Sequence, residues 1–291
     1  MALPDCIKAA FPKDYHAKLP TGVPVVQRPT PDPEARDKAN TVGPAEATWY
    51  LPVDLEHHRP TGVFLPQGFS YQAGEVDVIL FFHGNKQGNF TNVDRYWHKH
   101  PSNINLREDL NASKKMAILV VPTMGENPGH GGSDNLDLFR QPGAAACYLQ
   151  HVLQWLVKYD TNFPDRESPP AIRKLVLAGH SGGGFPIILQ MAALKEMIDE
   201  IWCFDTIYGD PDAWVNYASH NPTKRVTIYH AIQSLDVLAK IVEAKKKMED
   251  KLGKTIDNLE ILKGANEHFH CLTDNFGKQI NRSTLSNKPQ P

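Results

Sequence analysis

A serine between glycines is the feature of this chain that most directly indicates chemistry. Residues Gly179–Gly183 read Gly-His-Ser-Gly-Gly, which places Ser181 at the centre of a Gly-x-Ser-x-Gly pattern. A serine hydroxyl can act as a nucleophile when a base is near enough to take its proton. Backbone N–H groups at the beginning of a helix can then stabilise the oxyanion that forms beside it. These residue types predict covalent, acyl-transfer chemistry.

The residues around this serine predict a strand, a tight turn and a helix. Lys174–Ala178 is an apolar run of strand length, and Phe185–Leu194 is an apolar run of helix length. A turn this sharp leaves no room for side chains beside the serine, and glycine tolerates it because it has no Cβ. The five-residue pattern also occurs by chance, so it is the strand and the helix that favour a catalytic serine over an ordinary glycine-rich turn.

From residue 47 onward, strand patterns alternate with helix patterns. The expected strands are 48–53, 62–65, 77–82, 116–121, 174–178, 200–204, 225–230 and 259–262, the first two forming a hairpin. The expected helices are 103–112, 142–159, 185–194, 212–219, 235–252 and 271–280. Ser234 is a candidate cap for the helix that begins at residue 235. Strands that are apolar on both faces indicate an α/β fold with a mostly parallel central sheet and helices on both faces.

Proline is frequent in residues 1–45. Because proline lacks a backbone donor and fixes φ, we expect an extended, irregular arm there, ahead of one domain at 46–291. The four cysteines, which we expect to be buried free thiols, lie far apart and form no Cys-x-x-Cys spacing. They are Cys6, Cys147, Cys203 and Cys271.

The composition, 41% hydrophobic and 22% charged, is that of a soluble globular protein. A net charge of −2 gives no reason to expect nucleic acid or an anionic membrane as a partner. No apolar run approaches the roughly 18–20 residues that span a bilayer. The amino terminus lacks a basic start and an apolar signal core, so we expect a cytoplasmic protein by default, with a mature secreted form still open. The oligomeric state is not indicated.

In open α/β sheets, sites form where the parallel strands end. The residues that follow the predicted strands are His83–Asn85, Thr123–Gly125, His180–Gly182, Asp205–Thr206, Gln233–Asp236 and His268–His270. In chain order they supply a serine, two acids and a pair of histidines, all expected at one edge of the sheet.

With this order of serine, acid and histidine, and with His-Gly after the third strand, the chain resembles the α/β-hydrolase fold serine hydrolases over residues 47–283. It lacks the His-Gly-Gly-Gly loop of one branch, because residues His83–Lys86 read His-Gly-Asn-Lys. We match it to no esterase or lipase subfamily. The substrate implied by the resemblance is a small-molecule or polymer ester. We expect no cofactor, and no metal either, because nothing completes a site around the His-x-His pairs at 98–100 and 268–270.

The resemblance assigns Ser181 as nucleophile and places the base after the last strand, where we favour His268 over His270. For the acid we favour Asp205, because it ends an apolar strand, where a buried carboxylate needs a partner such as an imidazole. Asp236 remains the alternative. It follows the next strand, where the family more often has its acid, but an aspartate in the first turn of a helix is also favoured for helix stability alone.

The predicted oxyanion donors are the backbone N–H of Gly182 and a second N–H from the loop after the third strand. That second donor is expected at Asn85, with Gly84 allowing close approach. Four aromatic residues could form an apolar subsite for the substrate or could simply pack on the surface: Tyr96, Trp97, Tyr208 and Trp214.

Together these residues predict an enzyme that hydrolyses a carboxylic ester through an acyl-enzyme. The same residues could cleave amides or peptides. A catalytically silent binding protein with the same fold is the alternative from another class.

Overall fold

The structure is a computed structural model that describes residues 48–54, 59–69, 74–84, 96, 104–122, 139, 143–159, 169–206, 210–231 and 234–288. The predicted proline-rich arm, residues 1–45, lies outside the described residues. Three predicted site residues, Asn85, Trp97 and Tyr208, also lie outside them.

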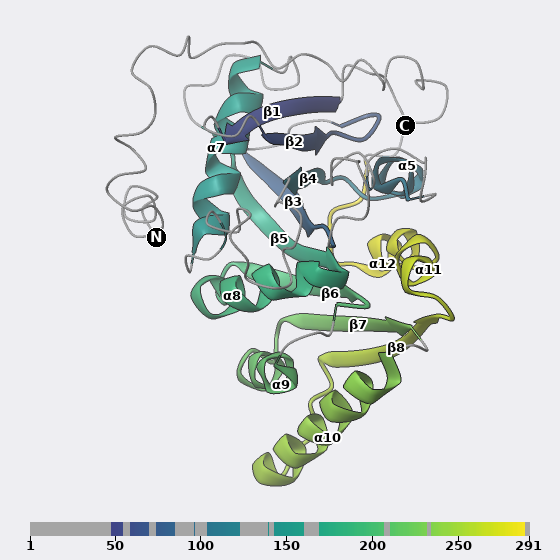
Figure 1. The fold of residues 1–291 in the computed structure, drawn as a ribbon. Helices are drawn as coiled ribbons and strands as arrows, with labels where there is room; N and C mark the ends of the chain where they lie inside the picture. Colours follow the sequence, from purple (N-terminus) through teal and green to yellow (C-terminus); the bar gives the residue numbers. More distant parts are fainter. Residues whose placement is uncertain are drawn as a thin grey trace.

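The centre of the molecule is an eight-stranded sheet with the strand order β1-β2-β4-β3-β5-β6-β7-β8 (Figure 1). The strands are β1 (Thr48–Asp54), β2 (Arg59–Phe64), β3 (Glu75–Phe82), β4 (Ile118–Pro122), β5 (Ala171–His180), β6 (Ile198–Phe204), β7 (Arg225–Ala231) and β8 (Leu259–Ala265). β1 pairs antiparallel with β2, and β2 pairs antiparallel with β4. Every pairing from β4 through β8 is parallel, which confirms the predicted leading hairpin and mostly parallel sheet.

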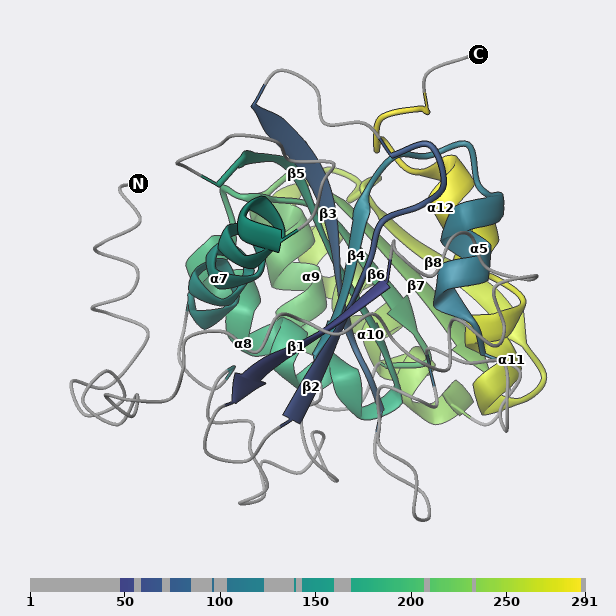
Figure 2. The same cartoon turned by 90° about the horizontal axis from the view of Figure 1, so that it is seen from above.

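Helices cover both faces of this sheet, as Figure 2 shows from above. Helices α7 (Ala144–Tyr159), α8 (Gly184–Leu194) and α9 (Pro211–His220) lie on one face. Helices α5 (Leu106–Ala112), α11 (His268–Thr273) and α12 (Phe276–Arg282) lie on the other face. The long helix α10 (Leu235–Leu252) packs against α9 at the β8 end of the sheet. No helix of the described residues is both long and apolar enough to cross a membrane.

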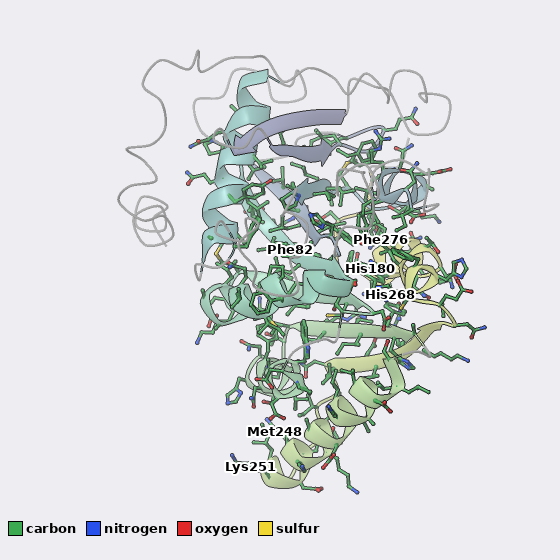
Figure 3. The ribbon with its side chains drawn as sticks, viewed as in Figure 1. Phe82, His180, Met248, Lys251, His268 and Phe276 are labelled. Atoms are coloured by element: carbon green, nitrogen blue, oxygen red, sulfur yellow. The ribbon has the colours of Figure 1, made fainter. Side chains whose placement is uncertain are left out.

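The core forms because the central strands are apolar on both faces. In β3 every residue except the first is buried, and in β4 every residue is buried. Burying each large apolar side chain contributes about 1.5–3 kcal/mol relative to exposure. Phe276 anchors α12 to this core, since its ring centroid lies 5.7 Å from that of Phe204 and 5.8 Å from that of Phe81 (Figure 3). Cys203 and Cys271 are buried free thiols, as predicted.

The structure corrects the predicted closing helix at 271–280. Two short helices, α11 and α12, occupy this region and are separated at Asp274 and Asn275. The Asn275 side chain donates to the carbonyls of Gly264 and Cys271, both at 2.9 Å. Asparagine side chains of this kind compete with the helical hydrogen bonds, so the chain turns instead of continuing. At the other end of α11, His268, which was expected just before the helix, is its first residue.

Candidate active site

Ser181 lies in a strained turn at the carboxyl end of β5. The strand ends at His180, and a short 3-10 helix (η3, Ser181–Gly183) leads directly into α8. Ser181 has a φ of 55°, in the left-handed region that non-glycine residues seldom adopt. Such strain persists only where the surrounding structure enforces it, and it is found most often at functional sites.

Two glycines let the end of β3 approach this turn. A Cβ on Gly183 would lie 2.1 Å from the Phe82 carbonyl oxygen, so no other residue fits there without displacing β3. A Cβ on Gly84 would lie 2.8 Å from Ser181 Cβ and 2.9 Å from the Tyr96 hydroxyl. The residues after β3 therefore lie directly against Ser181, as the prediction of a close approach at Gly84 requires.

Asp205 lies at the same edge, directly after β6, and its residue is only 1% exposed. Its φ of 51° is again in the left-handed region. One carboxylate oxygen lies 2.5 Å from His268 Nδ1, and the other accepts hydrogen bonds from the Ala231 N–H and the Ser234 hydroxyl. Burial alone would raise the pKa of Asp205, but the hydrogen bonds from His268, Ser234 and Ala231 outweigh it and hold this pKa below its ordinary value.

The histidine that meets this carboxylate is His268, whose side chain is 23% exposed. Because Nδ1 faces Asp205, a neutral His268 carries its proton on Nδ1 and keeps Nε2 as an acceptor. In that arrangement an imidazole can take a proton from a hydroxyl while the carboxylate stabilises the imidazolium that forms.

The alternative residues lie elsewhere on the surface. Asp236 is exposed in the first turn of α10. The His270 side chain is 57% exposed, and its Nδ1 lies 3.5 Å from a Glu267 carboxylate oxygen. The structure thus brings Asp205 together with His268 and does not bring Asp236 together with His270.

Ser234 has a hydrogen-bond partner that sequence reasoning did not predict. It does occupy the N-cap position of α10, as predicted, but its hydroxyl makes no capping bond to that helix. It donates instead to Asp205, 29 residues earlier in the chain. A serine before a helix is normally interpreted as a cap, so the bond to Asp205 is revealed only by the three-dimensional structure.

Gly84 was also predicted to contribute to the oxyanion site. Its N–H donates to the Tyr96 hydroxyl at 2.9 Å, so it is not available to a substrate oxygen in this structure. Gly182 is buried at the start of the helical segment, and Asn85 lies outside the described residues.

The predicted aromatic subsite needs correction at two positions. Tyr96 is 1% exposed and Trp214 is 0% exposed, so neither presents a surface to a substrate. Trp214 belongs to the buried face of α9, and Tyr96 supports Gly84 and His180 from inside the molecule. Apolarity alone does not separate a core aromatic from a pocket aromatic, which is why the sequence misplaced both.

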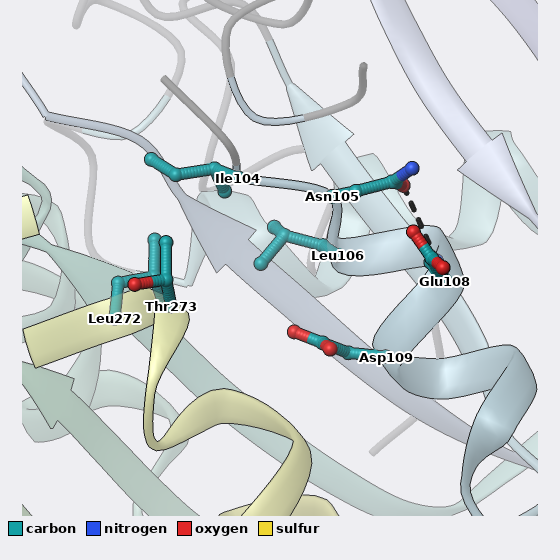
Figure 4. A pocket seen from close by; sticks show the side chains of 7 residues that line it. All are labelled: Ile104, Asn105, Leu106, Glu108, Asp109, Leu272 and Thr273. Atoms are coloured by element: carbon teal, nitrogen blue, oxygen red, sulfur yellow. Dashed lines mark hydrogen bonds between the residues drawn. The ribbon is translucent and has the colours of Figure 1, made fainter. Parts of the chain in front are cut away.

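A pocket of about 160 Å³ lies between α5 and α11 (Figure 4). Its lining residues are Ile104, Asn105, Leu106, Glu108, Asp109, Leu272 and Thr273. Burial, with a smaller contribution from the neighbouring Glu108, raises the pKa of Asp109 to about 7. None of the predicted site residues lines this pocket, although His268 and Thr273 belong to the same short helix.

Comparison with known proteins identifies the fold. No protein-family model and no curated protein matches the sequence. Among solved structures, a ferulic acid esterase is similar at a TM-score of 0.50 and 16% identity, over 81% of this chain and 97% of that one. The feruloyl esterase module from Clostridium thermocellum is similar at a TM-score of 0.52 and 13% identity, over 91% of this chain and 97% of that one. The chain has the α/β-hydrolase fold, as its sequence predicted.

Proposed function

We propose that this protein is a serine hydrolase that cleaves a carboxylic ester through an acyl-enzyme, with Ser181, His268 and Asp205 as its catalytic triad. The observation that carries the proposal is the contact of 2.5 Å between His268 Nδ1 and the buried Asp205 carboxylate, at the sheet edge where Ser181 occupies its strained turn. The feruloyl and ferulic acid esterases of similar fold favour an ester as the first substrate class to test.

In the proposed mechanism, Ser181 Oγ attacks the ester carbonyl carbon while His268 Nε2 takes the hydroxyl proton. Asp205 accepts the Nδ1–H hydrogen bond and stabilises the imidazolium. The tetrahedral intermediate collapses, and the alcohol leaves with the proton from Nε2. Water then attacks the acyl-enzyme with the same base, which releases the acid and restores Ser181.

The oxyanion would be held by backbone N–H groups after the nucleophile and after β3. Gly182 supplies the first donor, because the opening N–H groups of a helix have no partner within the helix. Asn85 is the proposed second donor, and Gly84 allows that segment to approach Ser181. Loss of one such donor raises the barrier by about 3–4 kcal/mol.

The test is turnover of p-nitrophenyl esters of graded acyl length, including feruloyl esters, by wild type and Ser181→Ala. We expect at least about a ten-thousand-fold loss of kcat in Ser181→Ala, since removing a triad nucleophile has effects of that size. Ser219→Ala is the matched control, because its hydroxyl bonds to the Asn216 carbonyl and to His220 Nδ1, both on α9. Retention of more than residual activity by folded Ser181→Ala would contradict the proposal.

Labelling with a fluorophosphonate separates the alternatives. A serine hydrolase is modified at Ser181 in the folded state, whereas a catalytically silent protein of this fold is not. Parallel assays with p-nitroanilides then distinguish an esterase from an amidase or peptidase.

A further inference from the structure

The residue before the proposed nucleophile, His180, is fully buried between Tyr96 and His268. Its Nδ1 lies 2.7 Å from the Tyr96 hydroxyl, and its Nε2 lies 3.2 Å from the backbone carbonyl oxygen of His268. His180 and Tyr96 are 0% and 1% exposed. This histidine, the last residue of β5, therefore connects the strand that leads into Ser181 to the helix that carries the proposed base (Figure 3).

The hydrogen-bond partners determine which way this connection runs. A carbonyl oxygen only accepts, so His180 Nε2 carries a hydrogen and donates to His268. In the neutral ring Nδ1 is then an acceptor, and the Tyr96 hydroxyl donates to it. The same tyrosine oxygen accepts the Gly84 N–H at 2.9 Å. One continuous chain of hydrogen bonds thus runs from the segment after β3 to the first residue of α11.

Ring packing supports the same connection. The ring centroids of His180 and His268 are 4.4 Å apart, and the Phe269 centroid lies 5.2 Å from that of His180. His268 is therefore held by Asp205 at Nδ1, by His180 at its backbone carbonyl, and by His180 against its ring. The Asp205 bond fixes one atom of the ring, and the His180 bond adds a contact at the backbone of α11, a helix of only six residues.

We propose that His180 and Tyr96 are positioning residues that hold the His268 imidazole in line with Ser181 and fix Gly84 beside it. This proposal rests on the proposed function, because it assumes that His268 is the base. Its physical reason is that proton transfer needs Nε2 within hydrogen-bond reach of the serine hydroxyl, and His268 lies 88 residues after His180, the residue next to that serine.

The kinetic test uses His180→Phe, which keeps a ring but removes both hydrogen bonds, and Tyr96→Phe, which removes only the hydroxyl. For His180→Phe we expect kcat to fall about 10- to 100-fold, the scale of a small misplacement of a catalytic group, with KM changed by less than about twofold. Tyr96→Phe loses the bonds to His180 and Gly84, and we expect at least about a five- to tenfold loss of kcat, which is the scale of a single neutral hydrogen bond.

Two further variants show whether the residues act as one unit. The double variant Tyr96→Phe/His180→Phe should lose less kcat than the product of the two single losses, because the Tyr96–His180 bond is removed in both single variants; independent effects would multiply. His180→Gln keeps an N–H that can reach the His268 carbonyl, so it should recover part of kcat. The matched control is Tyr229→Phe, which loses a buried hydroxyl bonded to Gln279 and Arg282 but leaves the backbone bond to Asp205 in place, and should keep wild-type kcat.

A spectroscopic measurement separates this proposal from the proposed function. The His268 Nδ1 proton should give a downfield ¹H signal, assigned by its loss in His268→Gln and measurable without substrate. We expect it to exchange faster with water in His180→Phe and to be unchanged in Tyr229→Phe. If Ser181→Ala stays active, the hydrolase proposal fails, and so does a positioning role in catalysis. If Ser181→Ala is inactive but His180→Phe matches Tyr229→Phe in kcat and in this signal, only the positioning proposal is wrong.

Discussion

Buried carboxylates lie at both ends of the parallel strands, and their partners differ. At the carboxyl end, Asp205 is bound by an imidazole, a hydroxyl and a backbone N–H. At the amino end, Asp77 accepts from Arg173 Nε at 2.8 Å and from the Ser286 N–H at 2.6 Å.

Glu200, also at the amino end, accepts from the Trp202 indole at 2.9 Å and from the Thr284 N–H at 2.5 Å. The bond from Thr284, together with the one from Ser286 to Asp77, holds the segment that follows α12 along the amino edge of the sheet. That segment continues there, since the Met116 N–H donates to Ser286 and the Lys288 N–H donates to Lys114.

A buried carboxylate needs hydrogen-bond partners, and the chemistry of those partners determines what the carboxylate can do. A guanidinium, an indole and backbone amides keep their protons near neutral pH, so the amino-end carboxylates fasten the chain. An imidazole can act as a general base, which is why the proposed function gives its partner Asp205 a role in proton transfer. Backbone strain is likewise found at the carboxyl edge of the sheet: among the described non-glycine residues, only Ser181 and Asp205 have positive φ.

The largest effect is expected when the carboxylate at the carboxyl edge, Asp205, is exchanged for its amide. In Asp205→Asn we expect kcat for p-nitrophenyl esters to fall by about ten-thousand-fold, because the amide favours the wrong tautomer of His268. Asp236→Asn, a change to an exposed residue, should keep wild-type kcat. Equal and mild losses in both variants would remove Asp205 from the triad.

At the amino edge the same exchange should affect stability. Asp77→Asn should lower the free energy of unfolding by about 2–3 kcal/mol, the scale of hydrogen bonds to a charged group, measured by urea denaturation. The kcat per folded molecule should stay at the wild-type value. A large loss of kcat in the folded variant would show that the two edges are not separate in function.

Ser234→Ala should remove one of the hydrogen bonds that stabilise the Asp205 carboxylate and leave the others in place. The pKa of Asp205 is lowered in the folded state, so its contribution to stability is present above its unfolded pKa and is lost as the pH falls through the folded pKa. Removing the Ser234 donor brings the folded pKa closer to the unfolded one. We expect acid unfolding, followed by circular dichroism, to begin at a higher pH than in wild type; an unchanged midpoint would argue against this bond.

The contribution of Asp109, in the pocket between α5 and α11, to stability should depend on pH in the opposite direction. Its folded pKa is raised to about 7, so the unfolded chain ionises first and stability falls as the pH rises from about 4 to 7. Asp109→Asn removes this effect. We expect its melting temperature to exceed that of wild type at pH 8 by more than it does at pH 5, and a pH-independent difference would contradict the raised pKa.

The sequence predicted the fold well because the apolar pattern of each strand or helix is contained in that segment alone. No knowledge of the segment's partners in the fold is needed to recognise it. The serine turn was predicted for the same reason. The partners were harder, since Asp205 and His268 are 63 residues apart, and Asp236 fits the family order equally well. Ser234 was read as a helix cap.

His180 and Tyr96 were not predicted as partners at all. They are 84 residues apart, and nothing in either local pattern points to the other. The closing helix was wrong because its apolar stripe continues across Asn275, whose side-chain hydrogen bonds end α11.

The central claim is that Ser181 carries the acyl group. Its most direct test is the mass of the protein quenched in acid during steady-state turnover of p-nitrophenyl acetate, followed by peptide mapping. The account predicts one acetyl group on the peptide that contains Ser181 in wild type and none on that peptide in Ser181→Ala. Turnover with Ser181 unmodified, or with the acetyl group on another residue, would contradict it.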